Sequence, residues 1–205
     1  MKWVVATNNK NKLRELREIL SGVGIEAVSL RDAGLDLVIE ENAETYEENS
    51  LIKAKAVYDI TGMAAIADDS GLEVYALNNA PGVHSARYAA LDGKENATDE
   101  ENLNKLLFEL RDVPKEARGG KFISCIACVL GKNRSFTLRG ECEGEITFER
   151  RGEAGFGYDP VFYVPSMGKT YSEMTSEEKN SISHRGRALL GLEEKLRELK
   201  DRGEI

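Results

Sequence analysis

The chain has 205 residues, of which 41% are hydrophobic and 31% are charged, and its formal net charge is −8 at pH 7. This composition predicts a folded globular protein and excludes an intrinsically disordered chain. The negative charge argues against nucleic acids and anionic membranes as partners, and no apolar run approaches the ~18 residues that a membrane-spanning helix needs. The sequence opens on an apolar, strand-like segment without a secretory leader, so we expect a cytoplasmic protein.

In the first half, apolar strand-like segments alternate with amphipathic helical ones. The expected strands are residues 3–6, 27–30, 63–67 and 72–77. A helix follows the first strand and ends near Gly22, and a capping box of Thr45 and Glu48 predicts a second helix that stops at Gly62. The stretch 78–93 is expected to be an irregular loop.

The second half turns to β-structure. The expected strands are residues 122–130, 135–141, 145–149 and 161–164, with turns at 131–133 and 143–144. A second capping box, Thr98 with Glu101, begins a helix that ends before Pro114. Thr175 caps a short helix, and Ser183 is the expected N-cap of the last one. We therefore predict one mixed α/β domain, residues 1–205.

The cysteines are three in number, too few and odd in count for a disulfide framework. Cys125 and Cys128 have the CxxC spacing of redox and zinc sites, but they lie in the apolar run 122–130, which is typical of a buried strand. Residues three apart on a strand face opposite sides, so the two thiols could not share a metal ion. We expect both thiols to pack in the core.

The first polar cluster that could form a site lies between the first strand and the first helix. Its residues are Thr7, Asn8, Asn9, Lys10, Asn11 and Lys12. Loop amides and a helix N-terminus favour a bound phosphate, although the spacing is not that of a P-loop. A plain polar turn with an Asn capping the helix explains the local sequence equally well.

The second cluster begins at Glu40-Glu41 and continues into the predicted helix. Thr45, Asn49 and Lys53 have i, i+4, i+8 spacing and so line one helical face. Such a row can bind phosphate oxygens while the preceding carboxylates bind a metal ion. The alternative is structural, because the capping box alone explains Thr45 and Glu48.

The third cluster is Asp68-Asp69-Ser70-Gly71, which we expect at the carboxyl end of a buried strand. Adjacent carboxylates repel each other unless a cation neutralises them. Mg²⁺ prefers a few carboxylate oxygens together with waters and substrate phosphates. An Asp-rich turn is the structural alternative, but the buried strand before these acids favours a site.

The fourth cluster is C-terminal. Glycines on either side of Phe156 leave its ring on an open loop, where it could stack on a base. His184 and Arg185 fall in the first turn of the last helix, where the helix dipole disfavours cations. A role as hydrogen-bond donors to a ligand accounts for them better than helix stability does.

Together these clusters resemble the inosine triphosphate pyrophosphatase family, the non-standard purine NTP pyrophosphatases. The matching motifs run in family order over nearly the whole chain. They are Thr7-x-Asn9-x-x-Lys12, Glu41, Thr45-x-x-Glu48-Asn49-x-x-x-Lys53, Asp68-Asp69-Ser70-Gly71-Leu72, Pro81-Gly82-x-x-Ser85-Ala86-Arg87-Tyr88, Phe156-Gly157-Tyr158-Asp159-Pro160 and Lys179-x-x-x-Ser183-His184-Arg185. Asn8 and Asn11 depart from the family pattern, in which relatives often carry glycine.

The resemblance implies an α/β fold with a long twisted mixed sheet flanked by helices, two lobes with the substrate cleft between them, and a homodimer. It implies that Glu41 and Asp69 bind Mg²⁺ and that Asp69 activates water. The residues that it implies for substrate binding are Thr7, Asn8, Asn9, Lys10, Asn11, Lys12, Lys53 and Ser70 on the phosphate side, and Phe156, Gly157, Tyr158, Asp159, Lys179, His184 and Arg185 around the base.

The chemistry expected from the resemblance is attack of water on the α-phosphorus of ITP, dITP or XTP, with pyrophosphate leaving. Lys179 or Arg185 could donate to the purine 6-oxygen and so reject adenine. The alternatives are a Maf-type pyrophosphatase, a nucleotide sensor that binds without cleaving, and a nucleic-acid binder. The Phe156 loop argues against the first, the carboxylates near the phosphate site against the second, and the net charge against the third.

Overall fold

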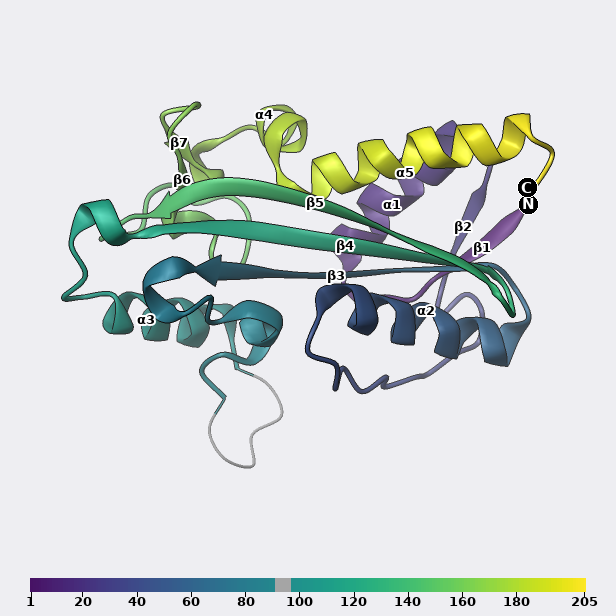
Figure 1. The fold of residues 1–205 in the computed structure, drawn as a ribbon, viewed down its shortest axis with the longest axis horizontal. Coiled ribbons are helices and arrows are strands. Elements are labelled where there is room, and N and C mark those ends of the chain that lie inside the picture. The colour runs from purple at the N-terminus through teal and green to yellow at the C-terminus, as the bar shows by residue number, and fades with distance from the viewer. Residues whose placement is uncertain (91–96) are drawn as a thin grey trace. The chain divides into compact units, whose positions relative to one another are not determined.

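The computed structural model describes residues 1–90 and 97–205, except for the side chain of Asn11. In this part of the chain seven strands form one sheet in the order β2-β1-β3-β4-β5-β6-β7 (Figure 1). The strands are β1 (Lys2–Val5), β2 (Glu26–Ser29), β3 (Ala65–Val74), β4 (Gly119–Gly131), β5 (Arg134–Ile146), β6 (Phe162–Val164) and β7 (Lys169–Thr170). The α-helices are α1 (Lys10–Gly22), α2 (Tyr46–Thr61), α3 (Asp99–Glu109), α4 (Ser176–Ile182) and α5 (His184–Asp201).

The sheet is mixed, as the sequence predicts. β1 pairs in parallel with β2 and β3, whereas β6 pairs antiparallel with β5 and β7. The α/β class with a mixed sheet flanked by helices is therefore confirmed.

The chain divides into two compact units. The first unit comprises residues 1–69, 124–140 and 187–205, and the second comprises residues 70–123 and 141–186. Strands β3, β4 and β5 and helix α5 each contribute residues to both units. The expectation of one domain with two lobes and a cleft stays a prediction.

In the first unit the sheet is covered on both faces. Trp3 and Val5 of β1 face one side and pack with Leu16 and Leu20 of α1 and with Leu192 of α5. The alternate strand residues face the other side and pack with Ala54 and Val57 of α2. Figure 1 shows α1 and α5 together on one face of the strands and α2 on the opposite face.

In the second unit α3 supplies a buried leucine face, and the aromatic rings of Phe122, Phe162 and Tyr171 pack together in the same core. The side chain of Arg118 is almost completely buried there. Its guanidinium donates to the carbonyl oxygens of Leu110, Ile146 and Thr147 at 2.5, 2.7 and 2.9 Å. These three bonds satisfy a buried charge and tie the end of α3 to the end of β5.

The predicted helix caps are confirmed, although α3 ends at Glu109, earlier than the predicted end at Pro114. The Thr45 side chain accepts from the Glu48 N–H at the start of α2, and Gly62 ends that helix with φ 65°. Complete capping boxes begin α3 at Thr98 and α4 at Thr175. The Ser183 hydroxyl accepts from the Gly186 N–H at 3.1 Å, as expected for the N-cap of α5.

The two separate strands predicted at residues 63–67 and 72–77 are wrong, because residues 65–74 form the single strand β3 and residues 75–77 form a 3₁₀ helix. Asp68 and Asp69 lie inside this strand rather than beyond its end. Their carboxylates receive bonds from neighbouring side chains, so the polar pair does not interrupt the strand. The pairing with β1 does stop nearby, at Val5 opposite Ile66, so the acids lie just past the parallel ladder.

The predicted turn at residues 143–144 is also wrong, because β5 runs without interruption from Arg134 to Ile146. A Cβ atom on Gly144 would lie 2.6 Å from Phe162 Cζ and from the Tyr163 carbonyl oxygen. The glycine therefore permits the close approach of β6 rather than a turn. In the stretch 78–93, residues 82–87 form a 3₁₀ helix, and residues 91–93 lie outside the described part.

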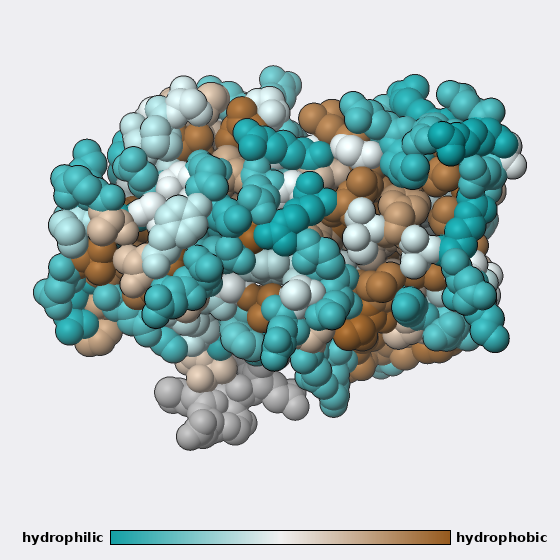
Figure 2. All heavy atoms as spheres, in the orientation of Figure 1, coloured by the Kyte–Doolittle hydropathy of each residue, from teal (hydrophilic) through white to brown (hydrophobic). Residues whose placement is uncertain are grey.

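The three cysteines are free and buried, which confirms the core position expected for Cys125 and Cys128. In residues 1–90 and 97–205 no helix combines the length and apolarity that crossing a bilayer requires. Figure 2 shows mainly hydrophilic residues on one face of the molecule, with hydrophobic ones gathered beside α2. Ile52 and Ile60 of that helix are among the exposed large hydrophobic residues.

Candidate active site

The segment between β1 and α1 forms a hydrogen-bonded turn. The Asn9 N–H donates to the Thr7 hydroxyl at 3.1 Å, and the Asn9 side-chain oxygen accepts from the Lys12 N–H at 3.2 Å. Asn9 thus caps α1, as the structural alternative expected. Asn8, Asn9 and Lys10 are exposed at this helix N-terminus, where positive potential favours an anion.

Lys12 projects from the first turn of α1 to the middle of β3. Its Nζ lies 2.7 Å from Asp68 Oδ2, and the Lys12 side chain keeps 16% of its surface exposed. Asp68 Oδ1 accepts from the Ser124 hydroxyl of β4 at 2.5 Å. Both carboxylate oxygens of Asp68 are therefore engaged within the protein.

Lys53 extends from α2 and is buried among carboxylates. Its Nζ donates to Glu41 Oε1, to the Asp68 carbonyl oxygen and to Asp69 Oδ1, each at 3.0 Å. Although burial disfavours its charged form, the Asp69 and Glu41 carboxylates raise the pKa of Lys53. The ammonium is thus a fixed counter-ion that uses all three of its protons on this chain's own oxygens.

Asp69 differs from Asp68 because only one of its carboxylate oxygens accepts a hydrogen bond from the described residues. Its Oδ1 accepts from Lys53, whereas its Oδ2 is buried and receives no hydrogen bond from any described residue. Burial, and then repulsion from the Glu41 carboxylate, raise the pKa of Asp69 to about 6, against the opposing effect of Lys53. The pKa of Glu41 is lowered, because attraction by the Lys53 ammonium outweighs the burial of its carboxylate. Asp69 is therefore suited to accept a proton near neutral pH.

A divalent cation fits this carboxylate pair. No group of three or more His, Cys, Asp or Glu side chains placed to hold a metal ion occurs in the described ranges. Glu41 and Asp69 nevertheless lie close together, since the Glu41 charge raises the pKa of Asp69 and a hydrogen bond with Asp69 helps to lower the pKa of Glu41. Mg²⁺ is commonly bound by one or two carboxylates, with waters and substrate phosphates as the other ligands.

The expected polar face of α2 is used mainly for local structure. Asn49 is fully buried, and its side chain exchanges two hydrogen bonds with the backbone of Ala43, at 3.0 and 3.3 Å. Thr45 is the helix cap. Of the three residues on this face, only Lys53 reaches the carboxylates, and Asn49 fixes the segment that carries Glu41.

In the second unit a cation lies between aromatic rings. Lys179 Nζ lies 2.6 Å from Asp159 Oδ2, 5.2 Å from the centroid of the Phe156 ring and 5.0 Å from that of Tyr171. The Phe156 N–H also donates to Asp159 Oδ2, at 3.0 Å. A Cβ on Gly155, whose φ is 86°, would lie 2.2 Å from that same oxygen. Gly155 therefore allows Asp159 to join the loop to Lys179.

Arg185 and His184 belong to the same unit. An Arg185 Nη2–H donates to the Ser70 hydroxyl at 3.1 Å, and the guanidinium carbon lies 6.0 Å from the Phe156 ring centroid. His184 is buried and stacks on Phe122, with ring centroids 4.7 Å apart and an angle of 13° between the rings. The structure thus brings Ser70, Phe156 and Arg185 together.

The other two loop residues predicted for the site, Gly157 and Tyr158, form hydrogen bonds with other residues of the second unit. The Tyr158 ring is buried and its hydroxyl donates to the Ser85 carbonyl oxygen at 2.8 Å. The Gly157 N–H donates to Asp99 Oδ2 of α3, also at 2.8 Å. No motif in the sequence singled out Asp99, or Ser124 in the apolar run of β4. A polar hydroxyl inside an apolar strand needs a hydrogen-bond partner, and this feature of the sequence could have drawn attention to Ser124.

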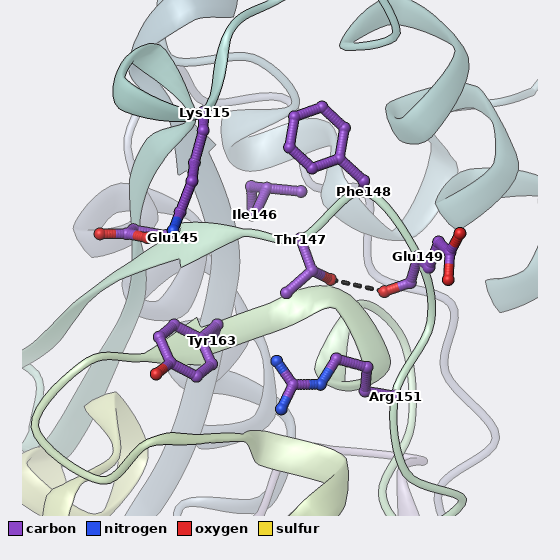
Figure 3. Close-up of a pocket in the computed structure, with 8 residues that line it drawn as sticks. All are labelled: Lys115, Glu145, Ile146, Thr147, Phe148, Glu149, Arg151 and Tyr163. Carbon is purple, nitrogen blue, oxygen red and sulfur yellow. Dashed lines mark hydrogen bonds between the residues drawn. The ribbon is translucent and has the colours of Figure 1, made fainter.

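A separate cavity of about 420 Å³ occurs in the second unit (Figure 3). Its lining residues are Lys115, Glu145, Ile146, Thr147, Phe148, Glu149, Arg151 and Tyr163. Figure 3 shows the Thr147 side chain turned to the Glu149 carbonyl oxygen, the one hydrogen bond drawn between these residues. None of the residues predicted for the site lines this cavity.

The fold and the lysine–carboxylate geometry are those of an α/β protein with a charged site on its sheet. The chain belongs to the Ham1 family, whose model matches residues 3–195. It is 47% identical over 192 residues to a dITP/XTP pyrophosphatase of Treponema denticola, covering 94% of this chain and 96% of that protein. It is equally identical over 197 residues to a dITP/XTP pyrophosphatase of Mannheimia succiniciproducens, covering 95% and 98%. A HAM1 protein from Coxiella burnetii has a similar structure, with a TM-score of 0.88, 42% identity and coverage of 97% and 99%.

Proposed function

We propose that this protein is a nucleoside triphosphate pyrophosphatase that hydrolyses dITP, ITP and XTP to the monophosphate and pyrophosphate. Two relatives that the chain matches over almost their full length are named dITP/XTP pyrophosphatase. The observation that carries the proposal to this chain is Asp69, a buried carboxylate with a raised pKa and one unused oxygen among lysines. Such a group can accept a proton from water beside a polyphosphate.

The phosphate chain binds to the residues of the first unit. The α1 N-terminus, Asn8, Lys10 and Lys12 supply donors and positive charge, and Lys53 balances the carboxylates. Asp69 orients a water and takes its proton as the water oxygen bonds to the α-phosphorus. The bond from that phosphorus to the bridging oxygen breaks, and pyrophosphate leaves with the electron pair. Mg²⁺, bound by Glu41 and Asp69, would offset negative charge on the phosphates.

The base binds to residues of the second unit. Phe156 offers a ring for stacking, and Lys179 and Arg185 offer protons to the 6-oxygen that hypoxanthine and xanthine share. Adenine carries an amino group at that position, so these donors would be left unpaired. Leaving buried donors unpaired is a strong basis for rejection.

The proposal also covers the oligomeric state of the protein and its location in the cell. We propose that the chain works as a homodimer in the cytoplasm, where free nucleotides are made and used. The net charge of −8 supports a free nucleotide rather than a nucleic acid as the substrate. Light scattering on purified protein would test the dimer.

Pyrophosphate release across ITP, XTP, dITP, GTP and ATP tests the function. We expect ITP, XTP and dITP to be the preferred substrates and ITP to give IMP and pyrophosphate in one step. Chromatography that found IDP and orthophosphate first would contradict the proposal. Turnover of modified pyrimidine nucleotides instead would favour the Maf-type alternative, and tight binding without turnover would favour a sensor.

A further inference from the structure

We propose that Ser124 is a positioning residue for phosphate binding, acting through Asp68 on Lys12. This inference rests on the proposed function, because it takes Lys12 to contact the phosphates. It adds a residue of β4 that none of the motifs in the sequence identifies. The three residues all belong to the first unit.

The chain of contacts runs from Ser124 to Lys12 through one carboxylate. The Ser124 hydroxyl, fully buried, donates to Asp68 Oδ1 at 2.5 Å, and Lys12 Nζ lies 2.7 Å from Asp68 Oδ2. A carboxylate bonded at one oxygen only can turn about its side-chain torsions. The Ser124 bond to Oδ1 restricts these torsions in Asp68 and so helps to present Oδ2 to Lys12.

Lys12 is the side chain that gains from this arrangement. A lysine has about four rotatable bonds, and fixing them on binding opposes affinity. Here the ammonium is already fixed by Asp68, while part of the side chain remains exposed to a ligand. An ammonium has three N–H donors, so Lys12 can pair with Asp68 and also donate to phosphate oxygens. Ser124 therefore contributes to affinity for the phosphate chain without touching the substrate.

The alternative is that Ser124 only satisfies a buried polar group. Ser50 of α2 offers a matched control, because it is also fully buried in the first unit and donates one hydrogen bond, to the Glu47 carbonyl oxygen at 2.9 Å. Replacing either serine by alanine removes one buried hydrogen bond. Only Ser124 is linked to Lys12.

The test is the KM for ITP at saturating Mg²⁺ and the affinity for inorganic pyrophosphate by calorimetry. We expect Ser124→Ala to raise the KM and weaken pyrophosphate binding by about five- to tenfold, with kcat changed less than about twofold. Ser124→Thr keeps the hydroxyl and should restore both constants. Ser50→Ala should lower the melting temperature comparably and leave both constants unchanged.

A double-mutant cycle identifies the route. In a Lys12→Met background, Ser124→Ala should change the KM less than about twofold, because Lys12 carries the effect. A full additional effect in that background, or an unchanged KM in Ser124→Ala, would overturn the proposal. If Ser124→Thr is poorly folded, Ser124→Cys, which retains a weak donor, should give an intermediate KM. Loss of ITP hydrolysis in the wild type would instead overturn the proposed function itself.

Discussion

In the first unit the lysines and aspartates proposed for the site lie on helices and a strand, whereas in the second unit the aromatic side of the proposed base site lies in a loop, with Lys179 and Arg185 on α4 and α5. Lys12, Lys53 and Asp69 lie on α1, α2 and β3; Lys12 forms an ion pair with Asp68 and Lys53 forms one with Asp69. Phe156 and Asp159 lie in a stretch whose shape depends on glycines with positive φ and on bonds from its backbone to carboxylates.

The contrast suggests that the first unit serves the phosphate chemistry and the second unit serves recognition of the base. Regular elements fix charged groups within a small tolerance, which suits the chemistry common to every nucleoside triphosphate. A loop can change its residues without disturbing the sheet, which suits the part of a substrate that varies. Mutations in the first unit should therefore lower turnover of all nucleotides, and mutations in the second should alter the preference among bases.

Asp69→Asn should have the largest effect. The amide keeps the shape and can still accept from Lys53, but it cannot take a proton from water. We expect kcat to fall by about 10²–10⁴ with every nucleotide, while ITP affinity changes less than about tenfold by calorimetry. A variant that retained more than a tenth of wild-type kcat would remove Asp69 as the base.

The same variant should be more stable than the wild type when no metal is bound. A folded-state pKa raised to about 6 means that the folded protein binds this proton more tightly than the unfolded chain does. The stabilisation is fully present below pH ~4 and is lost as the pH rises through about 6. Asp69→Asn avoids this loss, so its advantage in the free energy of unfolding should be on the order of 2 kcal/mol larger at pH 8 than at pH 4. Equal differences at the two pH values, measured by urea unfolding in EDTA, would contradict the assignment.

Lys179→Ala and Arg185→Ala should each reduce activity with ITP far more than the weak activity with ATP. Loss of a charged hydrogen bond to the base is worth about ten- to hundredfold in kcat/KM. The measurement is pyrophosphate release with both nucleotides. Equal factors for ITP and ATP would mean that these side chains do not distinguish the bases.

Gly155→Ala should reduce ITP activity by about tenfold, because its methyl group would collide with the Asp159 carboxylate and move Lys179. Gly168→Ala is the matched control, since Gly168 has φ 65° in the same unit but no heavy atom within 4 Å of the added carbon. Both variants should lose stability in thermal unfolding. Only Gly155→Ala should raise the KM for ITP, and a similar rise in both would attribute the effect to backbone strain.

The smallest effect is expected for Asp99→Ala, which removes the acceptor for the Gly157 N–H. We expect about a threefold rise in the KM for ITP and little change in kcat, because one exposed hydrogen bond contributes modestly. Asp99→Asn keeps an acceptor and should resemble the wild type. An unchanged KM in both variants would show that this contact does not order the loop.

Local signals predicted much of the fold. Thr45, Thr98 and Thr175 mark helix starts because their side chains satisfy backbone donors a few residues away. Such signals fail where the cause is distant in sequence. Asp68 and Asp69 suggested a break in β3, and only Lys12, Lys53 and Ser124 explain why the strand continues. Gly144 likewise suggested a turn, although the reason for the glycine lies on β6.

The site shows the same limit. The motifs predicted which residue types gather, and the structure joins Lys12, Lys53 and the acids of β3 in one network. Only the family resemblance divided the roles of Asp68 and Asp69, because adjacent identical residues carry no information of their own about which oxygens are already bonded. Ser124 and Asp99 were missed since each acts on a residue that is far away in the chain.

The charged network of the first unit also has a net charge. Its members are Lys12, Lys53, Glu41, Asp68 and Asp69. Two ammonium groups stand against three carboxylates, a formal sum of −1 when all five are ionised. A nucleotide without a metal ion would be repelled, because it and the cluster are both negatively charged. A bound divalent ion changes this sum to +1, so the polyphosphate should bind best together with its metal ion. The difference in affinity between the nucleotide alone and its metal complex should be larger at low ionic strength.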